Sequence, residues 1–184
     1  KVAGAALLLL AASTASQPYP AAEVLNAFQT ACANTRKFER LEKQLPKKGW
    51  QALPEGAEPR IAQLVSKGKA ALEDGEKLEG REYRKTVAGR QLYLVTSRVT
   101  DKSGIWASGC RLYDFEAGAP IADAKLVEWM KREPTHKQEL PNGDVIRKWE
   151  PGWRNGVAVD VDFAGHGGEF NEKFGLSGVV MIAS

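Results

Sequence analysis

Hydrophobic residues in the first third of the chain recur at three- and four-residue spacing, which is the period of an amphipathic α-helix. The pattern predicts three helices: one that begins at Pro20, one between Thr35 and Pro46, and one that begins at Pro59. Their apolar stripes are, in chain order, Val24, Leu25, Phe28, Ala31 and Cys32; Phe38, Leu41 and Leu45; and Ile61, Leu64, Val65 and Leu72.

From about residue 80 the apolar period changes toward two, and β-branched and aromatic residues replace Ala and Leu, which is typical of strands. A fourth helix, from Pro120 to the residues before Pro134, interrupts this pattern. The predicted strands are 81–88, 91–99, 105–115, 145–149, 157–163 and 176–182. We therefore expect an α+β fold in which N-terminal helices precede an antiparallel sheet of about six strands. One helix is inserted between the two halves of the sheet, and helices cover one of its faces.

The first residues of the chain have the composition of a secretory signal peptide. An apolar run ends at Ala12 and is too short to span a bilayer, and the small residues Ser13 and Ala15 suit cleavage after position 15. We expect residues 1–15 to be the signal peptide and 18–184 to form a single α+β domain. This predicts a periplasmic or secreted protein with no stable membrane anchor.

Two cysteines are present, and the pattern places both toward the protein interior. Cys32 lies on the apolar stripe of the first helix, and Cys110 lies on the inward face of its strand. In an exported chain such a pair most often forms one intramolecular disulfide, and we predict the bond Cys32–Cys110. The alternative is a free catalytic thiol, for which only His136 and His166 could serve as basic partner.

The charges are nearly balanced, with 26 Lys and Arg against 23 Asp and Glu, a formal net charge of +3. This balance argues against nucleic acid as a partner, which requires a strongly basic patch. The sequence contains no nucleophile elbow and no phosphate-binding loop, so it predicts neither a catalytic residue nor a cofactor.

One segment has residues that could hold a metal ion. Asp160, Asp162, His166 and Glu169 lie in or beside a glycine-rich stretch, and carboxylates and imidazoles are common metal ligands. The strict alternation of the neighbouring apolar residues, however, places both aspartates on the outward, solvated face of the strand. We expect the glycines to form a hairpin loop.

Trp149 and Trp153 flank the predicted turn Pro151–Gly152. Exposed aromatic side chains at such a turn could stack on sugars or anchor a protein partner. Alternatively, the two side chains close the end of a small core.

Six residues of the N-terminal third form a pattern that is similar to one in a group of small uncharacterised exported proteins of proteobacteria. They are Phe28, Cys32, Thr35, Phe38, Gly49 and Trp50. The resemblance implies export and a structural role for Cys32, and it implies no catalytic residue.

Three functional hypotheses follow. The leading one is a non-enzymatic exported binding or protein-interaction module, whose partner is a protein or an envelope ligand. The second is a cell-envelope hydrolase or metal-dependent enzyme that uses His166 with nearby carboxylates. The third is a secreted enzyme inhibitor, with the loop 154–156 as the inserting segment. The sequence does not define an oligomeric state.

Overall fold

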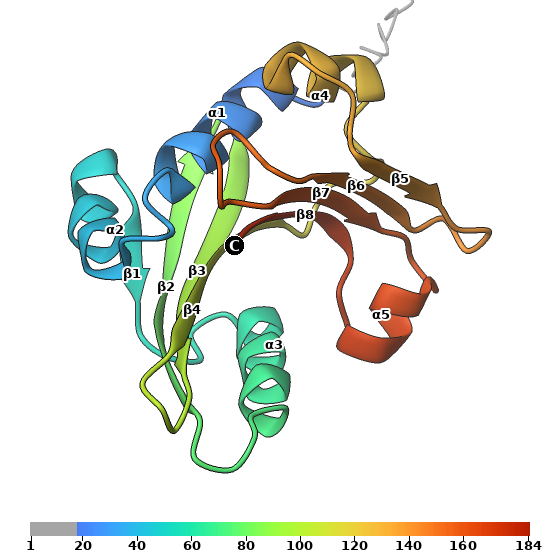
Figure 1. The fold of residues 1–184 in the computed structure, drawn as a ribbon. Coiled ribbons are helices and arrows are strands. Elements are labelled where there is room, and N and C mark those ends of the chain that lie inside the picture. Colours follow the sequence, from blue (N-terminus) through green and yellow to red (C-terminus); the bar gives the residue numbers. More distant parts are fainter. Residues whose placement is uncertain (1–17) are drawn as a thin grey trace, which may run out of the picture.

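An eight-stranded antiparallel sheet organises the computed structural model, which describes residues 18–184 (Figure 1). The strand order is β1-β2-β3-β4-β8-β7-β6-β5, so β8, the last strand of the chain, pairs with both β4 and β7 in the centre. The predicted signal peptide, residues 1–15, lies outside the described residues. Between residues 18 and 184, no helix has the length and apolar character needed to cross a membrane.

The helices are α1 (Ala21–Cys32), α2 (Phe38–Gln44), α3 (Pro59–Ala70), α4 (Asp123–Met130) and α5 (Glu169–Phe174), with a short 3₁₀ turn, η1, at Pro46–Lys48. The strands are β1 (Gln51–Leu53), β2 (Lys77–Val87), β3 (Arg90–Thr100), β4 (Trp106–Asp114), β5 (His136–Glu139), β6 (Val145–Trp149), β7 (Val159–Ala164) and β8 (Gly178–Ala183).

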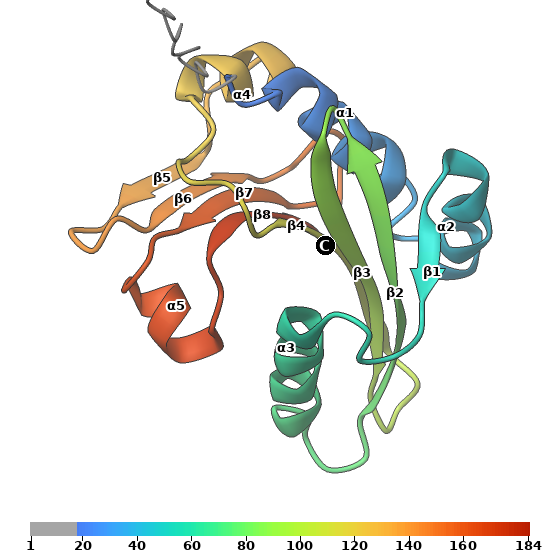
Figure 2. The same cartoon turned by 180° about the vertical axis from the view of Figure 1, so that it is seen from behind.

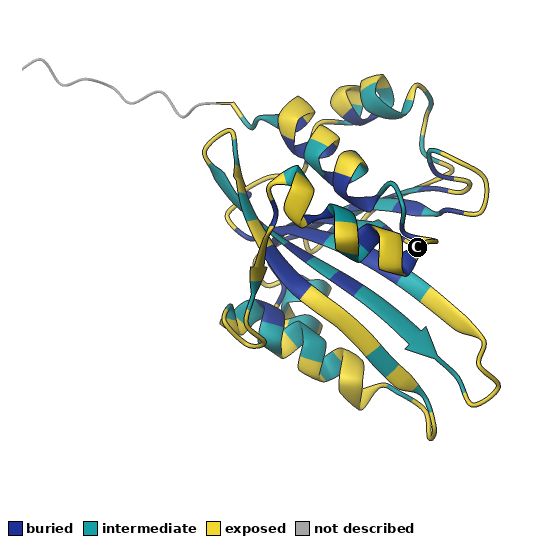
Figure 3. Ribbon diagram, turned by 90° about the vertical axis from the view of Figure 1, so that its left-hand side faces the viewer, coloured by how far each residue is buried: buried dark blue, intermediate teal, exposed yellow. Residues whose placement is uncertain are grey.

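The sheet is strongly bent, and helices lie on both of its sides. Helices α1, α2 and α4 lie against the convex face, whereas α3 and α5 lie in the hollow of the bend (Figures 1 and 2). Each face has its own hydrophobic cluster, the larger one on the convex side. Figure 3 shows that the helices turn their buried residues toward the sheet and their exposed residues away from it.

The hairpin between β2 and β3 is tight because of its two central residues. Ala88 and Gly89 have φ angles of 46° and 80°. Two successive positive φ values define a type I′ turn, whose twist matches that of the strands it joins. The two strands consequently stay in register from Val87↔Arg90 to Lys77↔Thr100, and this hairpin forms one wall of the hollow.

The predicted disulfide is confirmed. Cys32 at the end of α1 is bonded to Cys110 in β4, with a Cα–Cα distance of 5.6 Å across 78 residues of sequence. Both cysteines are fully buried in the convex-side cluster. Neither thiol is free, so the catalytic-thiol alternative is wrong.

The α+β class, the antiparallel sheet and the inserted helix α4 agree with the prediction, but three details were wrong. The sheet has eight strands rather than about six, because β1 has only three residues and β5 is exposed throughout and so lacks an alternating pattern. Helices cover both faces rather than one. In addition, the glycine-rich segment leads into α5 rather than forming a simple hairpin loop.

Candidate functional site

Asp160 and Asp162 share one face of β7, as predicted, but that face is half-buried rather than fully solvated. Their cross-strand neighbours on β8 are Ile182 and Val180, which belong to the hydrophobic cluster in the hollow of the sheet. Burial raises the pKa of Asp162 to about 7, and the nearby charge of Asp160 adds to this effect. Burial also raises the pKa of Asp160, against the lowering effect of Lys148.

His166 and Glu169, the other two members of the predicted cluster, are exposed. Over residues 18–184 no three His, Cys, Asp or Glu side chains are grouped so that they could hold a metal ion. The loop is organised by a different carboxylate, Asp144, which accepts hydrogen bonds from the backbone N–H groups of Gly165 (2.9 Å) and Phe170 (3.1 Å). The four candidate residues thus do not form a common site.

The two candidate tryptophans lie in the convex-side core rather than at an exposed turn. Trp149 is fully buried, and its indole N–H donates to the carbonyl oxygen of Arg132 at 3.2 Å. Trp153 packs edge-on against Phe28 and Trp129, with ring centroids 5.4 and 6.0 Å away. Both side chains therefore close the end of the core, which is the alternative to an exposed, ligand-binding turn.

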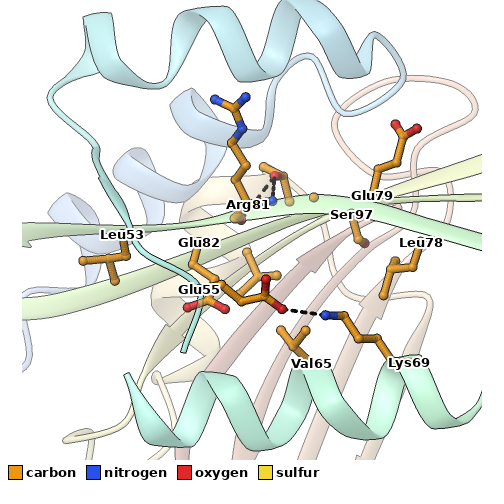
Figure 4. A pocket seen from close by; sticks show the side chains of 12 residues that line it. Leu53, Glu55, Val65, Lys69, Leu78, Glu79, Arg81, Glu82 and Ser97 are labelled. Carbon is orange, nitrogen blue, oxygen red and sulfur yellow. Dashed lines mark hydrogen bonds and ion pairs between the residues drawn. The ribbon is translucent and has the colours of Figure 1, made fainter. Parts of the chain in front are cut away.

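A cavity of about 400 Å³ lies in the hollow of the sheet, between α3 and the strands β1, β2 and β3 (Figure 4). This volume is within the range of small-molecule sites, roughly 300–1,000 Å³. Apolar side chains from four elements and a set of charged and hydroxyl groups line it: Leu53, Glu55, Val65, Lys69, Leu78, Glu79, Gly80, Arg81, Glu82, Val95, Thr96 and Ser97.

Helix α3 forms the cover of this cavity, and its start is fixed by local sequence. Pro59 occupies the first turn, and the Glu58 carboxylate accepts the backbone N–H of Arg60 at 3.2 Å. Val65 and Lys69 follow one helical turn apart, so both reach the same side of the helix. They face the cavity and the strands beneath it (Figure 4).

Glu82 is the most unusual residue of the lining. It lies in the middle of β2, paired with Leu53 of β1 and Val95 of β3. Because side chains alternate along a strand, Tyr83 enters the convex-side core while Glu82 points into the cavity. Only 6% of Glu82 is exposed, and its Oε2 atom has no hydrogen-bond partner in the described part of the chain.

The surroundings of Glu82 disfavour its charged form. Burial raises the pKa of its carboxyl group, and the negative charge of Glu55 adds to this, against the opposing effects of the Gly56 backbone N–H and of Lys69. The Lys69 ammonium is engaged elsewhere, in a 2.6 Å ion pair with Glu55 (Figure 4). That pair is exposed, whereas the Oε2 atom of Glu82 is buried without a hydrogen-bond partner.

Gly80 belongs to the cavity lining, at a point where β2 and β3 approach each other closely. A Cβ atom at this position would lie 2.0 Å from the backbone oxygen of Thr96, so no side chain fits here. Position 80 falls on the face of β2 that also carries Leu78 and Glu82. The close approach of β2 to β3 therefore requires glycine at this position of the cavity lining.

A second depression, of about 570 Å³, lies on the opposite face of the same strands, beneath α2. Its guanidinium groups are paired: Arg98 contacts Glu39 and Glu79, and Arg81 lies 3.4 Å from Glu42. The charged side chains of this depression thus stabilise the docking of α2, and the cavity with Glu82 is the better candidate site.

Sequence reasoning did not identify Glu82, because a glutamate in a weakly patterned strand resembles any solvated charge. The available signal was the alternation Leu78, Gly80, Glu82, which places a glycine and an acid on one face of a strand. That face would have been recognised as buried only if a helix had been expected over it.

Comparison with protein-family models, with curated proteins and with solved structures finds no match. The assignment of function therefore depends on the geometry of the site.

Proposed function

We propose that this chain is an exported, non-enzymatic binding protein, and that its ligand occupies the cavity beneath α3. The observation that carries the proposal is the Glu82 carboxylate, buried in a cavity of ligand size with an oxygen that lacks a partner. Burying a charged group without a partner is costly, and the cost is removed when a bound molecule supplies the missing contact. The predicted signal peptide and the Cys32–Cys110 bond support export.

The contacts of the two hydroxyl groups in the cavity lining, Ser97 and Thr96, favour binding over catalysis. Ser97 Oγ accepts a hydrogen bond from Arg111 at 2.9 Å, and Thr96 Oγ1 interacts with Glu42 on the convex side. An activated nucleophile requires a base in contact with its hydroxyl. Arg111 cannot act as one, and the Glu42 carboxylate that contacts Thr96 lies on the convex side, away from the cavity. In the described chain no comparable observation favours the enzyme or the inhibitor hypothesis.

A ligand panel tests the proposal. Mature protein with its disulfide intact is screened by thermal shift and then calorimetry against small cationic, neutral and anionic molecules that each carry an apolar group. We expect at least one class to bind saturably with one molecule per chain. The variant Val65→Trp fills the cavity and should abolish this binding.

Ser66→Trp is the matched control, because Ser66 lies next to Val65 on α3 but is exposed. Circular dichroism establishes that both variants fold. Binding that survives in folded Val65→Trp protein, or a panel in which no class binds, would overturn the proposal.

A further inference from the structure

We infer that the ligand of this cavity is a small organic cation, a protonated amine attached to an apolar body. The inference rests on the proposed binding function and specifies its ligand class. It follows from the charges around the cavity, from its apolar walls and from the contacts that already engage the nearby basic groups.

The cavity has an excess of negative charge where a ligand would enter. Glu55 and Glu82 both extend into the space between β2 and α3, and Lys69 is the cation placed between that helix and the strands (Figure 4). One ammonium group cannot neutralise two carboxylates, and Lys69 is paired with Glu55 at 2.6 Å. The Oε2 atom of Glu82 consequently remains without a donor.

The other basic groups nearby are engaged away from Glu82. Arg81 extends to the convex side, where its Nε lies 3.4 Å from the Glu42 carboxylate. Arg111 lies two strands from Glu82 in the same cross-strand row, and its Nη1 donates to Ser97 Oγ. A ligand ammonium would supply the donor and the positive charge that these groups do not.

The walls determine the rest of the ligand. Leu53, Val65, Leu78 and Val95 come from β1, α3, β2 and β3 and surround the carboxylate with aliphatic carbon. An alkyl chain that extends from the ammonium would replace water along these side chains. A carboxylate or phosphate in the same place would face Glu82 and Glu55, so anionic ligands are disfavoured.

Calorimetry with three probes of equal length tests this class: n-hexylammonium, 1-hexanol and hexanoate, each at neutral pH. We expect hexylammonium to bind at least about tenfold more tightly than hexanol, since a hydrogen bond to a charged group is worth more than one to a neutral group. Hexanoate should not bind. Lengthening the ammonium from butyl to hexyl should raise affinity by roughly fourfold per methylene.

The variant Glu82→Gln keeps the side-chain shape and removes the charge. It should weaken hexylammonium binding by at least about tenfold and leave hexanol binding nearly unchanged. Glu128→Gln, on α4 at the opposite face of the sheet, removes the same charge and should have no effect. In a second variant, Glu82→Leu, hexanol should bind more tightly than hexylammonium, which reverses the order seen in the natural sequence.

Each other outcome has a defined meaning. If hexanol or hexanoate binds as tightly as hexylammonium, and Glu82→Gln changes nothing, the amine class is wrong and the binding function stands. If none of the three probes binds but another member of the wider panel does, the amine class is again overturned. If the whole panel fails, the binding function itself is overturned.

Discussion

Asp162→Asn should stabilise the fold at neutral pH, because the carboxyl group of Asp162 is half-buried beside another acid. Burial and the charge of Asp160 raise the pKa of Asp162 from 3.8 to about 7. A carboxyl group whose pKa is higher in the folded state favours folding when it is protonated. This stabilisation is complete below the unfolded pKa and is lost as the pH rises through the folded pKa.

The magnitude follows from the two pKa values. One pKa unit corresponds to about 1.4 kcal/mol, so ionisation of Asp162 costs the folded state up to about 4 kcal/mol at pH values above 7. Asparagine cannot ionise and avoids this cost. Its side-chain oxygen can still accept the backbone N–H of Arg147, which donates to Asp162 Oδ1 at 3.3 Å.

Urea unfolding followed by tryptophan fluorescence measures the effect, with the disulfide intact and the pH varied between about 4 and about 8. We expect the variant and the natural sequence to be equally stable at the acid end, with a gain of up to about 4 kcal/mol for the variant at the alkaline end. Asp74→Asn, at a fully exposed side chain, is the control and should show no such trend. A gain that is the same at both ends of the range would refute the reasoning, because it could not come from ionisation of Asp162.

Three further predictions concern stability. Replacing Cys32 and Cys110 by alanine should lower the free energy of unfolding by about 4.5 kcal/mol, the chain-entropy value for the enclosed loop of 78 residues, measured by urea titration against the oxidised protein. Gly80→Ala should cost about 1–3 kcal/mol in the same assay, because its Cβ would collide with the backbone oxygen of Thr96. Gly68→Ala on α3 should instead raise stability by up to about 1 kcal/mol, since nothing lies within 4 Å of its Cβ; a loss there would mean that α3 needs flexibility at this position.

The sequence pattern predicted the elements with a clear period but not their arrangement in layers. The apolar stripe that ends at Cys32 and the inward position of Cys110, together with the predicted export of the chain, led to the correct disulfide. The strand 176–182 was also predicted, and it corresponds to β8, which lies between β4 and β7. These features were predictable because the spacing of apolar residues along a short segment indicates which of its faces is buried.

The second face of the sheet was missed because its burial depends on contacts between distant parts of the chain. Alternation along β7 separates Asp160 and Asp162 from the valines, but it does not show whether the polar face is open to water. The bend of the sheet places Val180 and Ile182 beside those aspartates, in a cluster with residues of α3 and α5. The same bend buries Glu82, so the candidate site could be identified only from the three-dimensional structure.

The Glu82 carboxyl group offers the most direct test of the account as a whole. Carbon-13 NMR of the mature protein can follow its titration, with the resonance assigned by comparison with Glu82→Gln. We predict a pKa above the ordinary glutamate value in the free protein, which falls when hexylammonium is added, because the bound cation stabilises the ionised form. An ordinary pKa that does not change on addition of the amine would contradict the claim that this buried carboxylate is the centre of a binding site.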